Sequence, residues 1–284
     1  MKALGLTLLT VSLSAVAAQA QSQLDAASDV QVLFDPFDGR AAVATLRFDI
    51  RHDEAEPPAA LQLRPVDGDW RLHPVGLRYG LRTSDGRESG GPALNAPVRA
   101  PDARRTSDLS VDVVVPALQF AEAGEATAEL EATLLDRAGA PIGSPRRVRV
   151  TAVVPPRAQA NIAGARGAFG SQPALPFIDF GEMQTGETRN AFLQVRANAA
   201  AAITAVSQNG GRLVNDDAPD SPGVPYRLEI DGVAASLESP LTLQRRPPAS
   251  LDGASYPMRF TLGDVSGAYA GTYRDVVTVD VTAM

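Results

Sequence analysis

The sequence predicts an all-β protein built from two antiparallel sandwich units, of which the second lacks its last strand. Three observations support this prediction. Apolar and polar residues alternate along short segments, turn-forming residues separate these segments, and the second half of the chain resembles the first half at a spacing of 147 positions. Together they indicate one sandwich fold that occurs twice.

Alternation with a period of two marks strands that bury one face. It is clear in residues 43–50 and 278–281. Turn chemistry interrupts such segments at short intervals, for example at residues 84–86 and 209–211. Many short strands separated by turns are typical of an antiparallel sandwich.

The repeat appears when the sequence is displaced by 147 positions without a gap. Turn glycines then fall on turn glycines, and apolar residues fall on apolar residues. The matched pairs are Gly39 and Gly186, Leu46 and Leu193, Gly76 and Gly223, Tyr79 and Tyr226, Leu81 and Leu228, and Ala123-Gly124 and Ala270-Gly271. We therefore expect two copies of one fold.

The two copies differ at their ends. The first copy continues beyond Arg137, the match of Met284, through a turn and into a further strand-like segment at residues 147–153. The second copy ends with residues 272–283, which match the segment 126–134 of the first copy. The second sandwich is therefore expected to lack the closing strand that the first one has.

A missing closing strand would leave a groove in which backbone groups and core side chains face water. Its edge is predicted to carry the inward-facing residues of the last strand, Val277, Val279 and Val281. One alternative stays open at this point. Residues 147–153 would serve either as the last strand of the first unit or as the first strand of the second.

Residues 1–20 indicate a cleavable secretory signal, with Lys2, an apolar run and the small-x-small ending Ala18-Gln19-Ala20. We expect a mature chain that starts at Gln21 and is exported through the inner membrane. The sequence contains no cysteine, so export brings no disulfide and stability must come from packing.

The 284 residues suffice for two domains. Pro155-Pro156 interrupts strand pairing and predicts the boundary between a first unit of residues 21–154 and a second of residues 155–284. The formal net charge is −7 and basic residues occur in runs no longer than pairs. Nucleic acid is therefore not an expected partner.

Four segments of the second unit occur in an order that resembles a known family. They are residues 177–181, 207–213, 224–228 and 270–279. This order is similar to that of the spore coat protein U domain, the pilin unit of archaic chaperone–usher pili. The resemblance covers nearly all of the second unit.

The resemblance implies an incomplete immunoglobulin-like sandwich. In this family a periplasmic chaperone supplies the missing strand first, and the N-terminal extension of the next pilus subunit then replaces it. The other implied partner is an outer-membrane usher. The protein would pass through the periplasm to the cell surface as part of a fimbrium.

A two-domain member of this family resembles the tip adhesin, whose outer domain binds a surface or glycan, for example in biofilm formation. The N-terminus agrees, because residues 21–29 offer only Leu24 as a large apolar residue before the first predicted strand at residues 30–34. Such a segment is expected not to donate a strand. The chain would only receive one.

Chemistry-bearing residues are sparse. The two histidines are His52 and His73, and no nucleophile motif or phosphate-binding glycine loop occurs. The acidic cluster at residues 52–56 and the group Asp216, Asp217 and Asp220 are interpreted as polar loops, and residues 35–39 as a turn. We expect no enzymatic activity, no metal and no cofactor.

The candidate surface-binding residues are apolar side chains in predicted loops of the first unit: Trp70, Leu94, Leu118 and Phe120. A single tryptophan is more often part of a core, which is the competing interpretation of Trp70. Two other functions remain as alternatives. One is a secreted carbohydrate-binding sandwich that acts alone, and the other is a periplasmic enzyme with an unfamiliar site.

Overall fold

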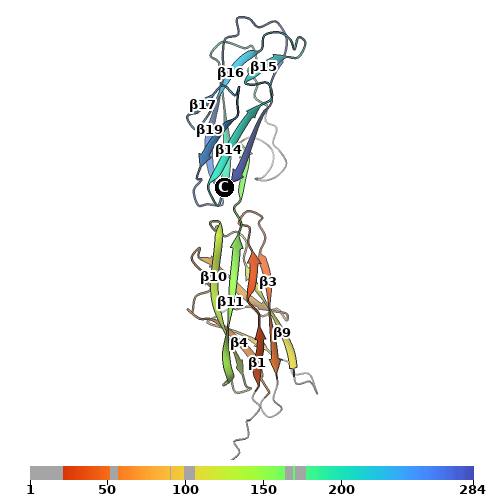
Figure 1. Ribbon diagram of the computed structural model, residues 1–284, viewed down its shortest axis with the longest axis vertical. Coiled ribbons are helices and arrows are strands. Elements are labelled where there is room, and N and C mark those ends of the chain that lie inside the picture. Colours follow the sequence, from red (N-terminus) through yellow and green to blue (C-terminus); the bar gives the residue numbers. More distant parts are fainter. Residues whose placement is uncertain (1–21, 52–56, 90, 99–105, 164–168, 170–176) are drawn as a thin grey trace, which may run out of the picture.

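The computed structural model describes residues 22–51, 57–89, 91–98, 106–163, 169 and 177–284. Every regular element in these residues is a β-strand, as predicted. The strands form two sandwich units that follow one another along the long axis (Figure 1). No described segment is a helix that could cross a membrane. The predicted secretory signal lies outside the described residues.

The N-terminal unit contains two facing sheets. One has the order β1 (Gln23–Ala27), β3 (Ala42–Arg51), β9 (Thr106–Val115), β7 (Gly80–Thr83). The other has the order β2 (Val30–Leu33), β11 (Pro141–Val154), β10 (Gly124–Leu135), β4 (Ala60–Pro65), β8 (Leu94–Pro97). A short pair, β5 (Arg71–Leu72) and β6 (Leu77–Arg78), completes the unit.

Alternation explains these strands. In β3, Leu46, Phe48 and Ile50 are fully buried, whereas Arg47 and Asp49 between them are exposed. Residues 21–29 were predicted to lie before the first strand, and this is wrong for residues 23–27, which form β1. Leu24 is buried there, because β1 pairs with β3 despite its weak apolar pattern.

Strand β11 contains residues 147–153, for which two assignments were open: the last strand of the first unit or the first strand of the second. It pairs antiparallel with β10 and parallel with β2, so it belongs to the N-terminal unit. Its inward-facing residues Val148, Val150, Ala152 and Val154 are buried in that core. The first sandwich is thus closed by the predicted strand.

The C-terminal unit repeats this arrangement with fewer strands. Its larger sheet has the order β12 (Ala158–Ile162), β13 (Thr188–Ala197), β19 (Ala254–Leu262), β16 (Val224–Ile230), β15 (Arg212–Asn215), β20 (Tyr273–Arg274), with β17 (Val233–Ala235) paired to β16. The smaller sheet has the order β18 (Leu241–Arg245), β14 (Ala201–Ser207), β21 (Val277–Ala283).

The repeat is visible in backbone geometry. Gly124, the first residue of β10, and its match Gly271, which precedes β20 and β21, have φ angles of 144° and 146°. The match of Gly76 with Gly223 is different, because only Gly76 has a positive φ. Gly223 is instead required by a close approach, since a Cβ there would lie 2.9 Å from the carbonyl oxygen of Leu213.

Hydrogen bonds connect the two units. Asn198 is buried, and its side chain accepts from the Arg157 amide at 2.7 Å and donates to the Pro155 carbonyl at 3.0 Å. The Ala123 amide donates to the Asn198 carbonyl at 2.9 Å. Arg157 also pairs with Asp35 at 2.9 Å. Hydrogen bonds and an ion pair from both units therefore hold the connecting segment around residues 155–157.

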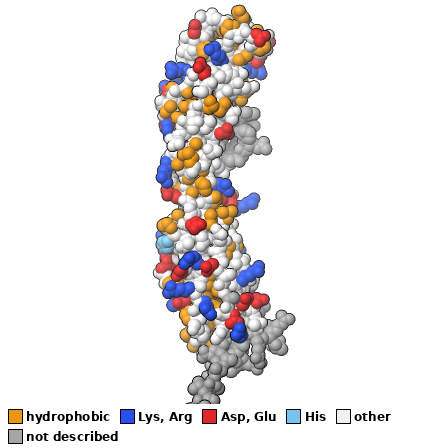
Figure 2. Space-filling view, viewed as in Figure 1, with side chains coloured by type: hydrophobic (Ala, Val, Ile, Leu, Met, Phe, Trp, Pro, Cys, Tyr) orange, Lys and Arg blue, Asp and Glu red, His pale blue; other side chains and the backbone are white. Residues whose placement is uncertain are grey.

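Figure 2 shows how side chains of different types are distributed over one face of the molecule. Apolar side chains lie in small groups along the visible face, with charged side chains of both signs between them. Isolated apolar groups of this kind are normal on a protein surface. The visible surface therefore shows no single large apolar patch.

We predict that Asn198→Ala lowers the free energy of unfolding by about 1–3 kcal/mol, because it leaves a buried amide and a carbonyl without their partner. Urea unfolding followed by circular dichroism measures the change. Asn95→Ala is the matched control, since Asn95 is exposed and should change stability by less than about 0.5 kcal/mol. Equal effects of the two substitutions would contradict the role given to Asn198.

Candidate functional site

The candidate site is the outer edge of β21. In the N-terminal unit, β10 is paired on both sides, by β4 and by β11. Its counterpart β21 is paired with β14 on one side, and no described strand pairs with its other side. The C-terminal sandwich, within the described residues, thus lacks a strand equivalent to β11.

The register identifies the equivalent residues. Leu130, Ala132 and Leu134 of β10 oppose Pro65, Leu63 and Leu61 of β4. Val277, Val279 and Val281 of β21 oppose Ser207, Ala205 and Ile203 of β14 in the same way. The three valines therefore occupy, 147 positions later, the inward-facing places of Leu130, Ala132 and Leu134.

Burial differs sharply at these equivalent places. Leu130, Ala132 and Leu134, beside β11 in the same sheet, are 0%, 0% and 2% exposed, whereas Val277, Val279 and Val281 are only half-buried. The described core of the C-terminal unit contains 14 buried residues with 16 half-buried apolar residues against it. The described core of the N-terminal unit contains 28 buried residues with 8 half-buried apolar residues against it. Among the described residues, no strand therefore covers the second core at the place of β11.

The other wall of this opening is formed by residues 177–180. They precede β13 as β2 precedes β3, and Ile178 and Phe180 pack partly buried against the core. β12 also lies close to β21, but no ladder joins the two strands. In the N-terminal unit the equivalent strand β1, besides pairing with β3, lies nearer to β11 than to β10. A strand added beside β21 would therefore lie between β21 and residues 177–180.

Arg189 holds residues 177–180 in place. Its Nε donates to the carbonyl of Asp179 at 2.8 Å and its Nη2 to the carbonyl of Phe180 at 3.0 Å. The guanidinium also lies over the Phe180 ring, 5.5 Å from the centroid, and pairs with Glu187 at 2.7 Å. One side chain thus fixes a segment that no described strand supports.

The equivalent of Arg189 in the first unit is Ala42, and there the segment is held differently. The Phe34 amide donates to the carbonyl of Val153 in β11 at 3.0 Å. In the closed unit, backbone pairing with β11 thus supports β2. In the open unit, the Arg189 side chain supports the equivalent residues 177–180. Sequence reasoning missed Arg189, although an arginine in register with the inward-facing Ala191 and Leu193 breaks the alternation of its strand.

Asp275 closes one end of the opening. Its carboxylate accepts hydrogen bonds from the Ser207 hydroxyl and the Tyr226 hydroxyl, both at 2.5 Å, and from the amides of Asn209 and Val276 at 3.1 and 2.8 Å. Burial, together with the bond to Asp275, raises the pKa of Tyr226 above its ordinary value. The apolar part of the opening therefore runs from Val277 towards Ala283.

The predicted surface-binding residues are not equivalent to one another. Leu94 was predicted in an exposed loop, and this is wrong, because it lies in β8 with 3% exposure and belongs to the core. Trp70 is half-buried, donates from Nε1 to the Gly91 carbonyl at 2.9 Å and packs edge-on against Tyr79. Phe120 is half-buried beside Phe37.

Leu118 is the exposed member of this group, at 77%. Its φ of 61° is unusual for leucine. The neighbouring Gln119 holds the loop, since its side chain accepts from the Arg78 amide and donates to the carbonyls of Arg78 and Pro116. The loop therefore presents Leu118 to solvent in a constrained backbone.

The polar loops contain ordinary local interactions. Asp216 pairs with Arg274 at 3.0 Å, and the described residues include no group of three metal-binding side chains. Residues 52–56 lie outside the described part of the chain. The turn predicted at residues 35–39 is present, with the Asp35 carboxylate accepting from the Phe37 amide and a positive φ at Gly39.

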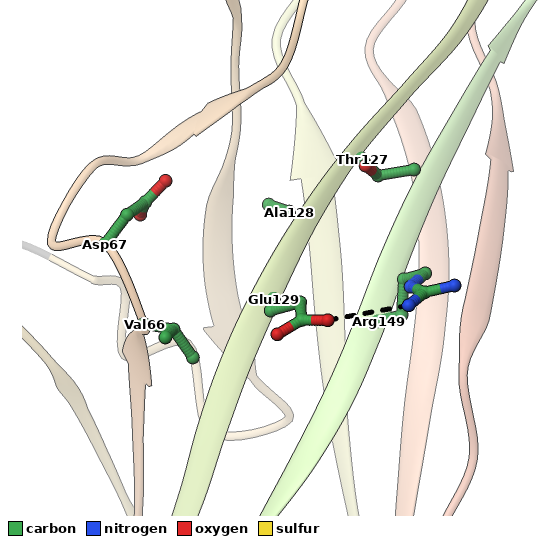
Figure 3. A pocket seen from close by; sticks show the side chains of 6 residues that line it. All are labelled: Val66, Asp67, Thr127, Ala128, Glu129 and Arg149. Atoms are coloured by element: carbon green, nitrogen blue, oxygen red, sulfur yellow. Dashed lines mark hydrogen bonds and ion pairs between the residues drawn. The ribbon is translucent and has the colours of Figure 1, made fainter.

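A shallow, open pocket of about 380 Å³ lies on the N-terminal unit (Figure 3). Glu129 and Arg149 form an ion pair of 3.5 Å across its floor. On the rim, Asp67 lies 3.6 Å from His73. The pocket is thus a solvated part of the sheet's outer face with internally paired charges.

The chain is similar in fold to solved pilus proteins. A chain of the CsuC-CsuE complex of chaperone and tip adhesion subunit, from the archaic chaperone-usher Csu pili of Acinetobacter baumannii, matches with a TM-score of 0.51 and 12% identity, covering 92% of this chain and 99% of that chain. No protein-family model matches the sequence, and no curated protein is significantly similar to it.

Two further solved structures match at lower TM-scores. CfaE, the adhesive subunit of the CFA/I fimbria of enterotoxigenic Escherichia coli, has a TM-score of 0.38 and 12% identity over 90% of this chain and 92% of that chain. The CupB6 tip adhesin from Pseudomonas aeruginosa has a TM-score of 0.31 and 14% identity over 85% and 86%. The fold of the chain therefore matches that of chaperone–usher subunits, on the strength of the first similarity.

We predict that Arg189→Ala releases residues 177–180 from the sandwich. Chymotrypsin should then cleave after Phe180 about tenfold faster, because the two hydrogen bonds from a charged donor are lost and the segment opens more often. Limited proteolysis followed by mass spectrometry measures this. Arg259→Ala is the matched control, since it removes an exposed pair with Glu229 on the same sheet and should leave cleavage after Phe180 unchanged. Unchanged cleavage in Arg189→Ala would show that other contacts hold the segment.

Proposed function

We propose that this chain is a subunit of a chaperone–usher pilus that accepts a strand from another protein into the open edge of its C-terminal sandwich. The observation that carries the proposal is the half-burial of Val277, Val279 and Val281, at places that are fully buried in the closed N-terminal sandwich. The fold similarity to chaperone–usher subunits supports it.

The physical basis is β-strand addition. Backbone hydrogen bonds attach an incoming strand to the free edge of β21, and its alternate apolar side chains fill the open core. Covering the three valines contributes about 1–2 kcal/mol each. In the proposed sequence of events, a periplasmic chaperone provides this strand first and the next pilus subunit replaces it at an outer-membrane usher.

The proposed position in the pilus is the tip. Strand β1 already pairs with β3, so residues 23–27 are not free to be donated, whereas no described strand pairs with the outer edge of β21 in the C-terminal unit. A subunit that accepts a strand without donating one ends the fibre. The N-terminal unit would then attach the pilus to a surface or glycan, as in biofilm formation, and the proposal includes no catalytic step.

The N-terminal unit provides a donor for a direct test. Because Met284 corresponds to Arg137, residues 138–154 appended after Met284 would continue the C-terminal unit as β11 continues the N-terminal one. We predict that this extension raises the free energy of unfolding of the C-terminal unit by about 3–6 kcal/mol. Urea unfolding followed by limited proteolysis measures the gain.

The control for this experiment carries the same extension with aspartate at the places of Ile142 and Val148. These buried residues oppose Leu134 and Leu130 in the closed unit and would lie beside Val281 and Val277, so the charged version should give no gain. If the chain without any extension is already as stable and protease-resistant as the extended one, the C-terminal sandwich needs no added strand and the proposed function fails.

For attachment, we predict that Leu118→Ser reduces retention of the purified chain on polystyrene or immobilised glycans several-fold and changes stability by less than about 0.5 kcal/mol, because the side chain is exposed. Leu33→Ser is the matched control, since Leu33 is another exposed leucine, at 65%. Equal retention of both variants would contradict a role of Leu118 in attachment.

A further inference from the structure

The outer face of the closed five-stranded sheet carries charge pairs. Arg64 on β4 bonds to Glu131 on β10. Glu129 on β10 lies 3.4 Å from Arg147 and 3.5 Å from Arg149 on β11. Figure 3 shows the pair of Glu129 and Arg149 bridging the two strands. On its solvent side, β11 is therefore matched to β10 by two basic residues opposite two acidic ones.

The open sheet has lost this pattern at the same places. The register puts Val276 at the position of Glu129, Thr278 at that of Glu131, and Val206 at that of Arg64. Val206 directly opposes Thr278, and Val206 and Val276 are 39% and 51% exposed. The edge that borders the opening is thus uncharged on its solvent side where the closed sheet is acidic.

The nearest charges lie further along the strand. Arg274 precedes Val276 and is paired with Asp216 at 3.0 Å. Asp280 follows Thr278 on the solvent-facing side of β21. A strand beside Val276 and Thr278 would therefore meet a carboxylate only beyond them, at Asp280.

We infer that the open edge distinguishes its donor by the donor's solvent-facing side as well as by its core-facing side. The occupant is an extended segment of another chain, with uncharged, preferably β-branched residues beside Val276 and Thr278. This inference rests on the proposed function and specifies the chemistry of the partner in it.

The physical reason is cross-strand pairing. Side chains directly opposite in an antiparallel pair contribute through matched charges or through β-branched contacts. Arginines at the positions of Arg147 and Arg149 would find no carboxylate at Val276 and Thr278, and would lose contacts that threonine or valine make. A strand like β11 fits its own unit better than the open edge, which disfavours exchange of β11 between copies of this chain.

A cycle of four proteins tests the inference. Residues 138–154 are appended after Met284, either unchanged or with Arg147→Thr and Arg149→Thr in the appended copy. Each extension is placed on the wild-type chain and on the chain with Val276→Glu and Thr278→Glu. The readout is the ratio of folded to unfolded C-terminal unit, from urea unfolding.

On the wild-type edge, the threonine extension should give a ratio about twofold to tenfold higher than the arginine extension. On the glutamate edge the order should reverse, because the acidic partners of the closed sheet are restored. The same order on both edges, or equal ratios throughout, would overturn the inference.

Failure of the proposed function gives a different result. In that case neither extension stabilises the C-terminal unit on either edge, relative to the chain without an extension. If both extensions stabilise it equally, the open edge accepts strands and only the inference about the donor's solvent-facing side is wrong.

Discussion

A sandwich has to cover the inner face of both its sheets, and in the C-terminal unit the described strands pair with the last strand, β21, on one side only. The effect of the missing strand can be seen by comparing the C-terminal unit with the closed N-terminal unit of the same chain. In the N-terminal unit β11 buries Leu130 and Leu134, and in the C-terminal unit the equivalent valines Val277 and Val281 stay half-buried. The two units differ here by the strand β11, which has no equivalent among the described strands of the C-terminal unit.

The rest of the C-terminal unit is adapted to this opening. Arg189 fixes residues 177–180 through two carbonyls, and Asp275 gathers four donors at one end. Both groups replace apolar residues of the closed unit, Ala42 and Ala128. Arg189 thus keeps one wall of the opening in position and Asp275 closes one end, and the valines of β21 provide the apolar surface for an added strand.

Much of the fold could be predicted from the sequence, because alternation and turn glycines are local signals. The repeat predicts Val277, Val279 and Val281 to be inward-facing residues of a last strand, and all three lie half-buried in β21. β1 was missed, because one leucine among small and polar residues gives no periodic signal. Leu94 was misplaced because Gly and Pro around it resemble a loop, whereas β4 recruits it into the core.

Other features depend on contacts between distant segments. The equivalence of β4 and β14 requires a spacing of 142 positions, so the spacing of 147 that relates β3 to β13 and β10 to β21 does not hold at β14. The role of Arg189 depends on residues ten positions earlier that form no strand, and the role of Asp275 depends on Tyr226 from the opposite sheet. No pattern of residue types encodes such contacts.

Hydrogen exchange along β21 in the purified full chain tests the missing strand most directly. Amides of an edge strand that point away from its neighbour have no partner, so alternate amides of residues 277–283 should exchange rapidly, while those of β10 are protected throughout. Uniform protection of β21 at the level of β10, in a chain that is alone in solution, would mean that its edge is already paired and would contradict the account.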